Sequence, residues 1–213
     1  MTRFSQREQK AANLVVVIEP FLASDIPLHR MPAVSDAEQL PVAAARAGDA
    51  TAWDALFKRY QLPLYVYVFE LLQNEQTTLD IVQETFLNSV RHIRTLRDDA
   101  KFGSWLFSIA HQKCQQHWRK PRREEPLPDD FLELASEETL PREVLIRAEQ
   151  EEEFMSLVNQ LSEAHRSVLL LHFLEDFPLD EIARITGVNV GTIKSRLHYA
   201  KKAMRTALAE RTA

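Results

Sequence analysis

Hydrophobic residues recur every three or four positions from about residue 36 onward, which is the spacing of helices with one buried face. Gly48 and Asp49 interrupt this spacing, and such a pair is typical of one helix ending and the next being capped. Pro121 closes the series, because proline has no backbone N–H to donate. The pattern predicts helices around residues 43–47, 53–60, 64–72, 78–91 and 102–119.

The helical spacing returns at residues 144–161 and predicts a further helix from Ser162 to near Asp176. Between these two halves, residues 121–141 combine prolines and acids with no apolar period, which is typical of a linker. Alternating strand patterns and hairpin dipeptides are missing from the sequence. We therefore expect an all-α protein in which two small helical domains are joined by a flexible acidic linker.

These patterns divide the chain into four segments. Residues 1–35 contain three prolines and no sustained period, so we expect a poorly ordered N-terminal extension. The expected segments after it are a helical domain over 36–122, the acidic linker over 123–141 and a second helical domain over 142–213.

The composition is that of an ordinary globular protein, with 45% hydrophobic and 27% charged residues among 213. The aliphatic run from Leu14 to Ile18 is far shorter than the roughly 20 residues of a membrane-spanning helix. It is also too short for a secretory signal, so we expect the protein in the cytoplasm. Cys114 is the single cysteine, which forbids an internal disulfide.

The formal net charge of −5 conceals charged segments of opposite sign. Residues 91–123 carry nine Lys or Arg against two acids, for a net charge of +7. Residues 124–153 carry twelve acids against two Arg, for −10, and residues 184–213 carry seven basic residues against one acid, for +6. Because phosphate backbones are bound by Lys and Arg, the two basic segments are candidates for binding a polyanion.

Residues 179–208 have the pattern of a helix-turn-helix. A short amphipathic helix ends at Gly187, residues 188–190 form the turn, and a second helix begins at Gly191. At 100° per residue, the apolar positions of the second helix fall within about 80° of one another and predict a single core stripe. That stripe consists of Ile193, Leu197, Ala200, Met204 and Leu208.

The opposite face of this second helix is basic and rich in hydroxyl groups, and it contains no acid before Glu210. A solvated helix face is the simpler interpretation of a lone basic helix. After a short helix and turn at this spacing, the pattern favours insertion into a DNA major groove. The candidate DNA-binding residues are Gly191, Thr192, Lys194, Ser195, Arg196, His198, Tyr199 and Lys202, and Arg205 lies on the same face.

Three segments of the C-terminal half resemble region 4 of bacterial sigma factors of the extracytoplasmic-function group, which are promoter-specificity subunits of RNA polymerase. They read His165-Arg166-Ser167-Val168-Leu169-Leu170-Leu171, Asp180-Glu181-Ile182-Ala183 and Gly191-Thr192-Ile193-Lys194-Ser195-Arg196-Leu197. The resemblance implies that residues 142–213 recognise the duplex −35 promoter element through the second helix.

The run Asp80-Ile81-Val82-Gln83-Glu84-Thr85-Phe86-Leu87 resembles region 2.2 of the same family, which docks on core RNA polymerase. The resemblance implies that Asp80, Gln83 and Glu84 make this contact. Positions i, i+3 and i+4 share one helical face, which leaves the apolar residues of the run for the core. Those apolar residues are Ile81, Val82, Phe86 and Leu87.

The segment Phe102-Gly103-Ser104-Trp105-Leu106-Phe107-Ser108-Ile109-Ala110 resembles regions 2.3 and 2.4, which in the family recognise and melt the −10 element and hold its non-template strand. Phe102, Trp105, Leu106 and Ile109 share one face and are interpreted as core residues. The family usually continues with Arg-Asn, whereas this chain has His111-Gln112. The basic residues available for the −10 strand are Arg91, Arg94, Arg97, Lys101, Lys113, Arg119 and Lys120.

The resemblance covers residues 36–122 and 142–208. It implies core RNA polymerase and promoter DNA as partners, namely the −35 duplex and the −10 non-template strand. Many family members are held inactive by an anti-sigma factor, which makes such a protein a further candidate partner. No small-molecule substrate, cofactor or catalytic residue is expected, and residues 1–35 lie outside the resemblance.

A metal site and an enzyme are two further hypotheses for this sequence. His111, Cys114 and His117 lie at 0°, 300° and 240° on a helical wheel, so one metal ion would need a further ligand from elsewhere. Packed or exposed helix residues are the favoured interpretation, and we expect no metal. Cys114 has no identifiable base beside it, and Walker and dinucleotide fingerprints are missing, so we expect no enzyme.

The alternative function is a stand-alone helix-turn-helix regulator that binds duplex DNA as a dimer. This hypothesis accounts for residues 160–208, but it does not explain residues 80–87 or the aromatic and basic segment after them. Mobility shifts of promoter DNA with and without core polymerase discriminate the two functions, because a sigma factor needs core for open-complex formation.

In the family, the linker between the two regions runs through polymerase channels that RNA later occupies. We hypothesise that the negative charge of residues 124–153 imitates RNA in that path. Replacing the acids of this segment by Asn and Gln is then expected to weaken holoenzyme formation or abortive initiation, measured by co-elution with core polymerase and by transcript yield. Unchanged transcription would remove the hypothesis.

Overall fold

The computed structural model describes residues 40–119 and 155–212. The proposed extension over 1–35, the acidic linker over 123–141 and Lys120 lie outside these ranges. The described residues form helices and contain no strand, which confirms the all-α fold class. Among them, no helix is both long enough and apolar enough to cross a membrane.

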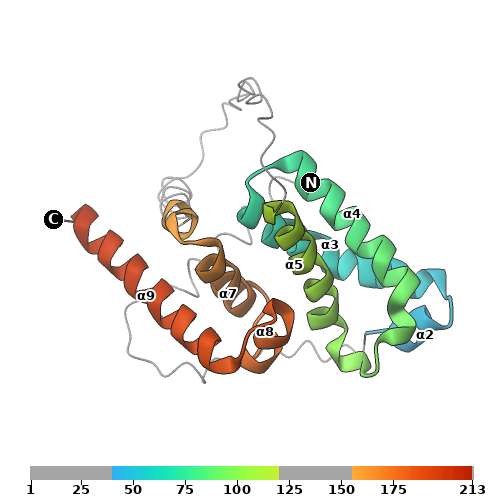
Figure 1. Ribbon diagram of the computed structural model, residues 1–213. Coiled ribbons are helices and arrows are strands. Elements are labelled where there is room, and N and C mark those ends of the chain that lie inside the picture. The colour runs from blue at the N-terminus through green and yellow to red at the C-terminus, as the bar shows by residue number, and fades with distance from the viewer. Residues whose placement is uncertain (1–39, 120–154, 213) are drawn as a thin grey trace, which may run out of the picture.

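The N-terminal unit is a bundle of helices that occupies one side of the molecule (Figure 1). Long helices α3, α4 and α5 pack against one another, and the short helix α2 packs on α3. Two short 3₁₀ turns, η1 and η2, connect α4 to α5. The bounds are α2 (Val42–Arg46), α3 (Ala50–Leu72), α4 (Glu75–His92), η1 (Ile93–Thr95), η2 (Asp99–Lys101) and α5 (Phe102–Arg119).

Side-chain caps begin the two helices α3 and α4. Asp49 accepts a hydrogen bond from the Thr51 backbone N–H at 2.8 Å, and Asn74 accepts one from Thr77 at 2.8 Å. Each cap satisfies one of the backbone donors that a helix N-terminus leaves free. Gly48 precedes the first cap with φ of 97°, a left-handed conformation that glycine adopts without strain.

The separate helices predicted over 53–60 and 64–72 are one continuous helix, α3, with Pro63 inside it. Proline normally breaks a helix because it removes one hydrogen bond and crowds the preceding turn. Here the apolar stripe runs without a shift across the proline, and its members are fully buried or nearly so. Packing of Leu56, Tyr60, Leu64, Tyr67 and Leu71 against the bundle holds the helix together.

The C-terminal unit comprises a helical segment at 155–160, α7 (Glu163–Leu174), α8 (Leu179–Thr186) and α9 (Val190–Thr212). Gly187 ends α8 with φ of 72°, and its backbone N–H donates to the carbonyl of Ala183. The left-handed residue lets the chain reverse into α9, as the helix-turn-helix pattern requires. The predicted stripe is buried at Ile193, Leu197, Ala200 and Met204, while the side chain of Leu208 is not among those described.

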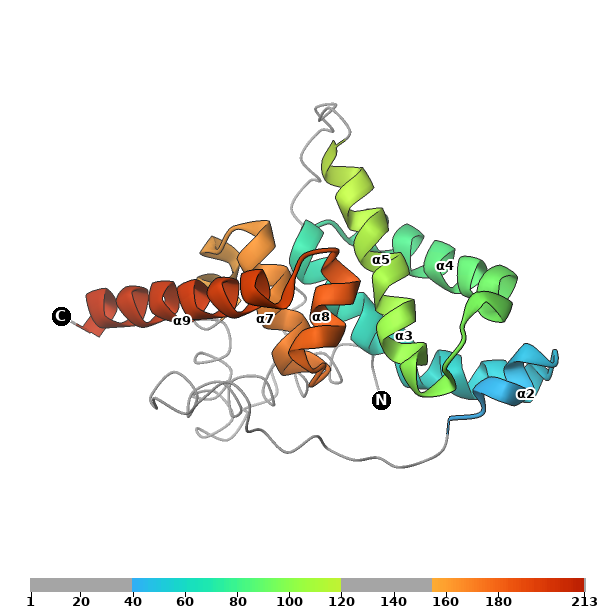
Figure 2. The ribbon, with the colours of Figure 1, turned by 60° about the horizontal axis from the view of Figure 1, so that its bottom comes forward.

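The two units pack directly on one another, and a single apolar core runs through both. Helix α8 lies against α5, and α7 lies against α3 (Figures 1 and 2). Rings from the two units meet at Phe107 and Phe177, with centroids 5.3 Å apart. The described residues therefore form one closed arrangement of the two units.

Candidate nucleic-acid and partner interfaces

Helix α9 presents an exposed polar face on its first three turns. Lys194, Ser195, His198, Tyr199 and Lys202 are exposed, as the wheel predicted. Their presentation follows from the buried stripe on the opposite side of the helix, which packs on α7 and α8. A long helix held in this way places Lys and Ser side chains where they can reach base edges and phosphates.

The start of α9 is fixed by Asn189 in the turn. Its side-chain oxygen accepts from the backbone N–H of Thr192 at 2.8 Å and from the Thr192 hydroxyl at 3.0 Å. A Cβ on Gly191 would lie 3.2 Å from the same oxygen, which is a tight contact. Gly191 and Thr192 therefore fix the start of α9 together with Asn189, a positioning residue that the sequence reasoning missed, although Asn is a common helix cap.

Arg196 is less exposed than Lys194 and Ser195, its neighbours on α9. It is only half-exposed, and its positive charge is close enough to His111 of α5 to help lower the pKa of that imidazole. The structure thus directs this predicted DNA-binding residue toward the N-terminal unit.

Tyr199 is an exposed aromatic residue on α9, at 58%. Its ring lies 5.7 Å from that of His198 and 6.4 Å from that of His165 on α7. The Ser162 hydroxyl is 2.8 Å from Nδ1 of His165 and fixes that ring. His165 therefore extends the α9 face onto α7, a juxtaposition that periodicity alone does not predict.

The predicted −10 residues fall into two groups. Arg91, Arg94 and Arg97 are exposed around the end of α4 and the loop after it. Arg119 is exposed at the far end of α5, about 27 Å from Lys101 at about 1.5 Å rise per residue. The structure therefore does not gather the whole predicted set into one patch.

The loop that carries Arg94 and Arg97 is braced from α2. The Arg46 guanidinium donates to the carbonyl of Leu96 at 3.2 Å and forms an ion pair with Asp99. Charge-assisted bonds to both ends of a loop restrict its motion, so this short segment has a defined shape.

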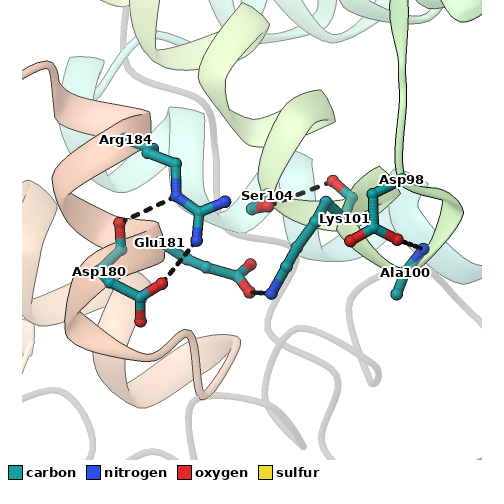
Figure 3. Close-up of polar contacts among 7 residues, drawn as sticks. All are labelled: Asp98, Ala100, Lys101, Ser104, Asp180, Glu181 and Arg184. Carbon is teal, nitrogen blue, oxygen red and sulfur yellow. Dashed lines mark hydrogen bonds and ion pairs between the residues drawn. The ribbon is translucent and has the colours of Figure 1, made fainter.

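Two of the predicted −10 cations, Lys101 and Lys113, are paired with acids. Lys113 forms an ion pair with Glu84 of α4, and Lys101 forms one with Glu181 of α8 (Figure 3). The first pair joins a predicted −10 residue to a predicted polymerase-binding residue. The second joins the two units of the chain.

The predicted polymerase-binding residues Asp80, Gln83 and Glu84 are exposed together on α4. The expectation that Leu87 lies in the core is wrong, because it is 49% exposed. Leu87 lies about 40° from Gln83 around the helix and so shares its face, whereas Phe86 points inward. Leu79 and Val90, exposed by 43% and 51%, belong to the same face.

The α4 face is thus mixed rather than purely polar. A helical wheel centred on Gln83 could have found its apolar members from the sequence, since residues 79, 83, 87 and 90 are near neighbours at helical spacing. Three large aliphatic side chains on one exposed helical face are typical of a surface that a protein partner covers.

The aromatic segment of α5 is mostly structural, as predicted. Phe102 and Leu106 are fully buried. Trp105 and Ile109 are half-buried, and the Trp105 ring packs 5.9 Å from that of Phe102.

Two family models match the chain, Sigma-70 region 2 over residues 56–124 and Sigma-70 region 4 over residues 151–204. The sigma factor BldN of Streptomyces coelicolor, an extracytoplasmic-function protein, is 31% identical over 183 residues, which are 84% of this chain and 68% of BldN. SigL of Mycobacterium tuberculosis is 30% identical over 170 residues, 79% of this chain and 96% of SigL. The chain is an extracytoplasmic-function sigma factor.

As a member of this family, the protein directs promoter-specific initiation of transcription by RNA polymerase. The match to region 2 disfavours the stand-alone regulator, which needs only the C-terminal half.

Two solved structures share the fold of the sigma factor. CnrH in complex with the cytosolic domain of CnrY has a TM-score of 0.58 at 22% identity, over 84% of this chain and all of that one. RpoE of Bartonella quintana in complex with the anti-sigma factor NepR has a TM-score of 0.56 at 19% identity, over 75% and 98% of the two chains.

His111, where the resemblance led us to expect an Arg, is buried in this sigma factor. The Tyr67 hydroxyl oxygen lies 2.8 Å from its Nδ1, and the Gln115 amide N–H donates to its Nε2 at 3.0 Å. Burial, assisted by the charge of Arg196, lowers the pKa of His111 to about 4. The imidazole is therefore neutral at pH 7, and with Nε2 accepting from Gln115 its Nδ1–H donates to the Tyr67 oxygen.

The cluster His111, Cys114 and His117 is split by the fold of the sigma factor. Both ring nitrogens of His111 are engaged, Cys114 is fully buried and His117 is exposed. Burial also raises the pKa of the Cys114 thiol to about 12, which keeps it protonated and unreactive. Within the described ranges, no group of three or more His, Cys, Asp or Glu residues could hold a metal ion.

The buried His111 gives the sigma factor a stability that falls below neutral pH. Its folded pKa of about 4 lies below the ordinary value of 6.5, so the unfolded chain binds a proton that the folded chain does not between these values. The free energy of unfolding is expected to fall by about 2 kcal/mol from pH 7 to pH 5 through this group. Urea unfolding at both pH values measures the loss.

The variant His111→Gln provides the control, because its amide N–H can donate to Tyr67 but does not titrate. It is expected to lose less stability than the wild type between pH 7 and pH 5. His172, whose pKa burial also lowers, contributes to both proteins and cancels in the comparison. Equal losses in the two proteins would contradict the assignment to His111.

Proposed function

We propose that the N-terminal unit, residues 36–122, docks on core polymerase and opens the −10 element, while residues 142–213 grip the −35 element through α9. The observation that carries this proposal is the exposed face of α9, held by the buried stripe and by the Asn189 cap. Residues 123–141 connect the two functions. The protein directs RNA polymerase to promoters and is not itself an enzyme. It acts in the cytoplasm, where the polymerase is.

The −35 contacts are proposed for the exposed face of α9. Arg, Lys and Ser side chains on a recognition helix bond both phosphates and bases, and roughly half or more of such bonds go to phosphate. The proposed set is Gly191, Thr192, Lys194, Ser195, Arg196, His198, Tyr199 and Lys202. His165 joins the set through its ring contact with Tyr199.

The −10 contacts are proposed for the loop after α4 and for α5. Exposed Arg91, Arg94 and Arg97 lie at the end of α4 and in the loop after it, which Arg46 braces. Single-stranded DNA binds where positive charge follows its backbone. Lys101, Lys113, Arg119 and Lys120 complete the proposed set.

The polymerase contact is proposed for the α4 face, with Asp80, Gln83 and Glu84 as polar members and Leu79, Leu87 and Val90 as apolar ones. An interface with apolar residues inside and polar residues around them fits the general anatomy of protein contacts. An anti-sigma factor is a further proposed partner, because NepR, named as such, is bound to the RpoE of the same fold.

Run-off transcription tests the function as a whole. Core polymerase plus this protein is expected to initiate at a subset of promoters from a genomic pool, whereas neither component alone does so. Tight and specific binding of the protein to promoter DNA without core polymerase would contradict the proposal and favour a stand-alone regulator.

The variant Lys194→Ala is expected to weaken use of −35-dependent promoters and to leave core binding intact. Loss of a cation from a DNA interface costs about 1–3 kcal/mol if it reads a base, and it lowers the salt slope of binding by about one if it contacts phosphate. Arg196→Ala is expected to act in the same direction. The measurements are transcript yield and holoenzyme affinity at several salt concentrations.

Lys58→Ala is the matched control, since Lys58 is also an exposed lysine, on α3, and pairs only with Asp54 one turn away among the described contacts. It is expected to transcribe as the wild type does. Loss of core binding in Lys194→Ala would contradict the proposal that α9 binds DNA.

The variants Asp80→Lys and Leu87→Asp are expected to lower affinity for core polymerase by about tenfold or more. Both side chains are exposed, so the fold loses little, whereas a covered interface loses a complementary charge or apolar contact. Co-elution with core polymerase and a competition titration measure the effect. Lys58→Glu serves as a control for charge reversal outside the α4 face, and core affinity equal to that control in both variants would refute the assignment.

A further inference from the structure

The loop from residue 93 to 101 turns apolar side chains inward and arginines outward. Ile93 and Leu96 are buried, whereas Arg97 is exposed. After the loop, Phe102 enters α5 and is fully buried. Apolar packing therefore fixes the loop at its two ends and at Leu96, and the stretch that contains Arg97 depends on polar contacts for its shape.

The guanidinium of Arg46 on α2 spans this stretch. Its Nη2 donates to the carbonyl of Leu96 at 3.2 Å and to one carboxylate oxygen of Asp99, and its Nη1 donates to the other oxygen at 3.4 Å. A planar guanidinium can make such a two-pronged contact, whereas the ammonium of a lysine cannot. Arg46 thus closes residues 96–99 into a ring, and Arg97 is an exposed member of that ring.

Arg46 is itself held in place by the short helix that carries it. Val42 and Ala45 of α2 are buried, and α2 packs on α3. At the end of α2, the backbone N–H of Gly48 donates to the carbonyl of Ala45 at 3.1 Å. Because the helix is fixed in this way, the contact with Arg46 restrains the loop.

The same contact sets the charge of the loop. Asp98 and Asp99 are its two acids, and a carboxylate without a cation beside it would repel a DNA phosphate. Asp99 is neutralised by Arg46. Asp98 instead accepts from the backbone N–H of Ala100 at 3.0 Å, and it does not contact Arg46 among the described hydrogen bonds and ion pairs (Figure 3). The two acids carry the same charge and differ in this one contact.

We propose that Arg46 is a positioning residue for the −10 strand, which holds Arg97 where the unpaired DNA strand passes. The proposal rests on the proposed function of the N-terminal unit. Arg46 acts without touching DNA, because both of its terminal nitrogens are engaged by the loop. A side chain that is already held in its binding position loses less conformational entropy when DNA binds, so the complex is tighter.

The variant Asp99→Asn separates positioning from a simple effect of charge. Loss of a negative charge beside DNA strengthens binding if charge alone matters, whereas loss of the ion pair with Arg46 weakens binding if the loop must be held. The ligand is a single-stranded oligonucleotide with the non-template −10 sequence of a promoter selected by run-off transcription. Holoenzyme made with full-length Asp99→Asn is expected to bind it about fivefold more weakly than wild type, measured by fluorescence anisotropy.

Asp98→Asn is the matched control, because it removes the same charge and its side-chain oxygen can still accept from Ala100. Holoenzyme with this variant is expected to bind the oligonucleotide as tightly as wild type or more tightly. Tighter binding by Asp99→Asn, or equal effects of the two variants, would overturn the proposal.

A double-mutant cycle tests whether Arg46 acts through Arg97. Arg46→Ala and Arg97→Ala are each expected to weaken oligonucleotide binding by about fivefold or more, and the double variant by no more than Arg97→Ala alone. Losses that multiply fully would show that the two residues act independently, which would refute the positioning role. Urea unfolding and co-elution with core polymerase are expected to match wild type in all three variants. If Arg46→Ala does not fold, the comparison of Asp99→Asn with Asp98→Asn decides.

The wild-type holoenzyme distinguishes failure of this proposal from failure of the proposed function. A wild-type protein that binds core polymerase but gives a holoenzyme without affinity for the oligonucleotide would refute the proposed function of the N-terminal unit. Normal binding by the wild type together with normal binding by Asp99→Asn and Arg46→Ala would refute the role of Arg46 alone.

Discussion

Burial of apolar side chains along α5 holds both helical units together. This helix packs on α3 and α4 of its own unit and on α8 of the other, so one core serves both units. Phe107 shows the double role, because its ring meets Tyr67 at 5.4 Å on one side and Phe177 at 5.3 Å on the other. Because three faces of α5 are packed against other helices, only the polar side chains outside these contacts are accessible to a partner.

The charges follow from that packing. Segments with net charges of +7 and +6 would repel each other if they met along their cationic faces. Lys101 instead meets Glu181, and Lys113 meets Glu84, so acids from neighbouring helices neutralise cations of the basic segment.

Much of the fold could be predicted because helical periodicity and caps are local. The bounds of α5 and the turn after Gly187 agree with their predictions. Two helices were predicted over 53–60 and 64–72, but they are one, α3, because packing on both sides of Pro63 outweighs one lost hydrogen bond. Leu87 was placed in the core because positions 80, 83 and 84 were taken as the exposed face, but its direction depends on which face of α4 meets α3 and α5.

The family and the two basic segments could be predicted from local sequence, since motifs and charge blocks are properties of neighbouring residues. The exposed face of α9 could be predicted too, because 100° per residue separates a buried stripe from an exposed one. The folded chain was needed to show that Arg196 lies near His111, that Glu181 meets Lys101, and that Arg166 caps α3. These contacts join residues 70 or more positions apart, and no local pattern encodes such pairs.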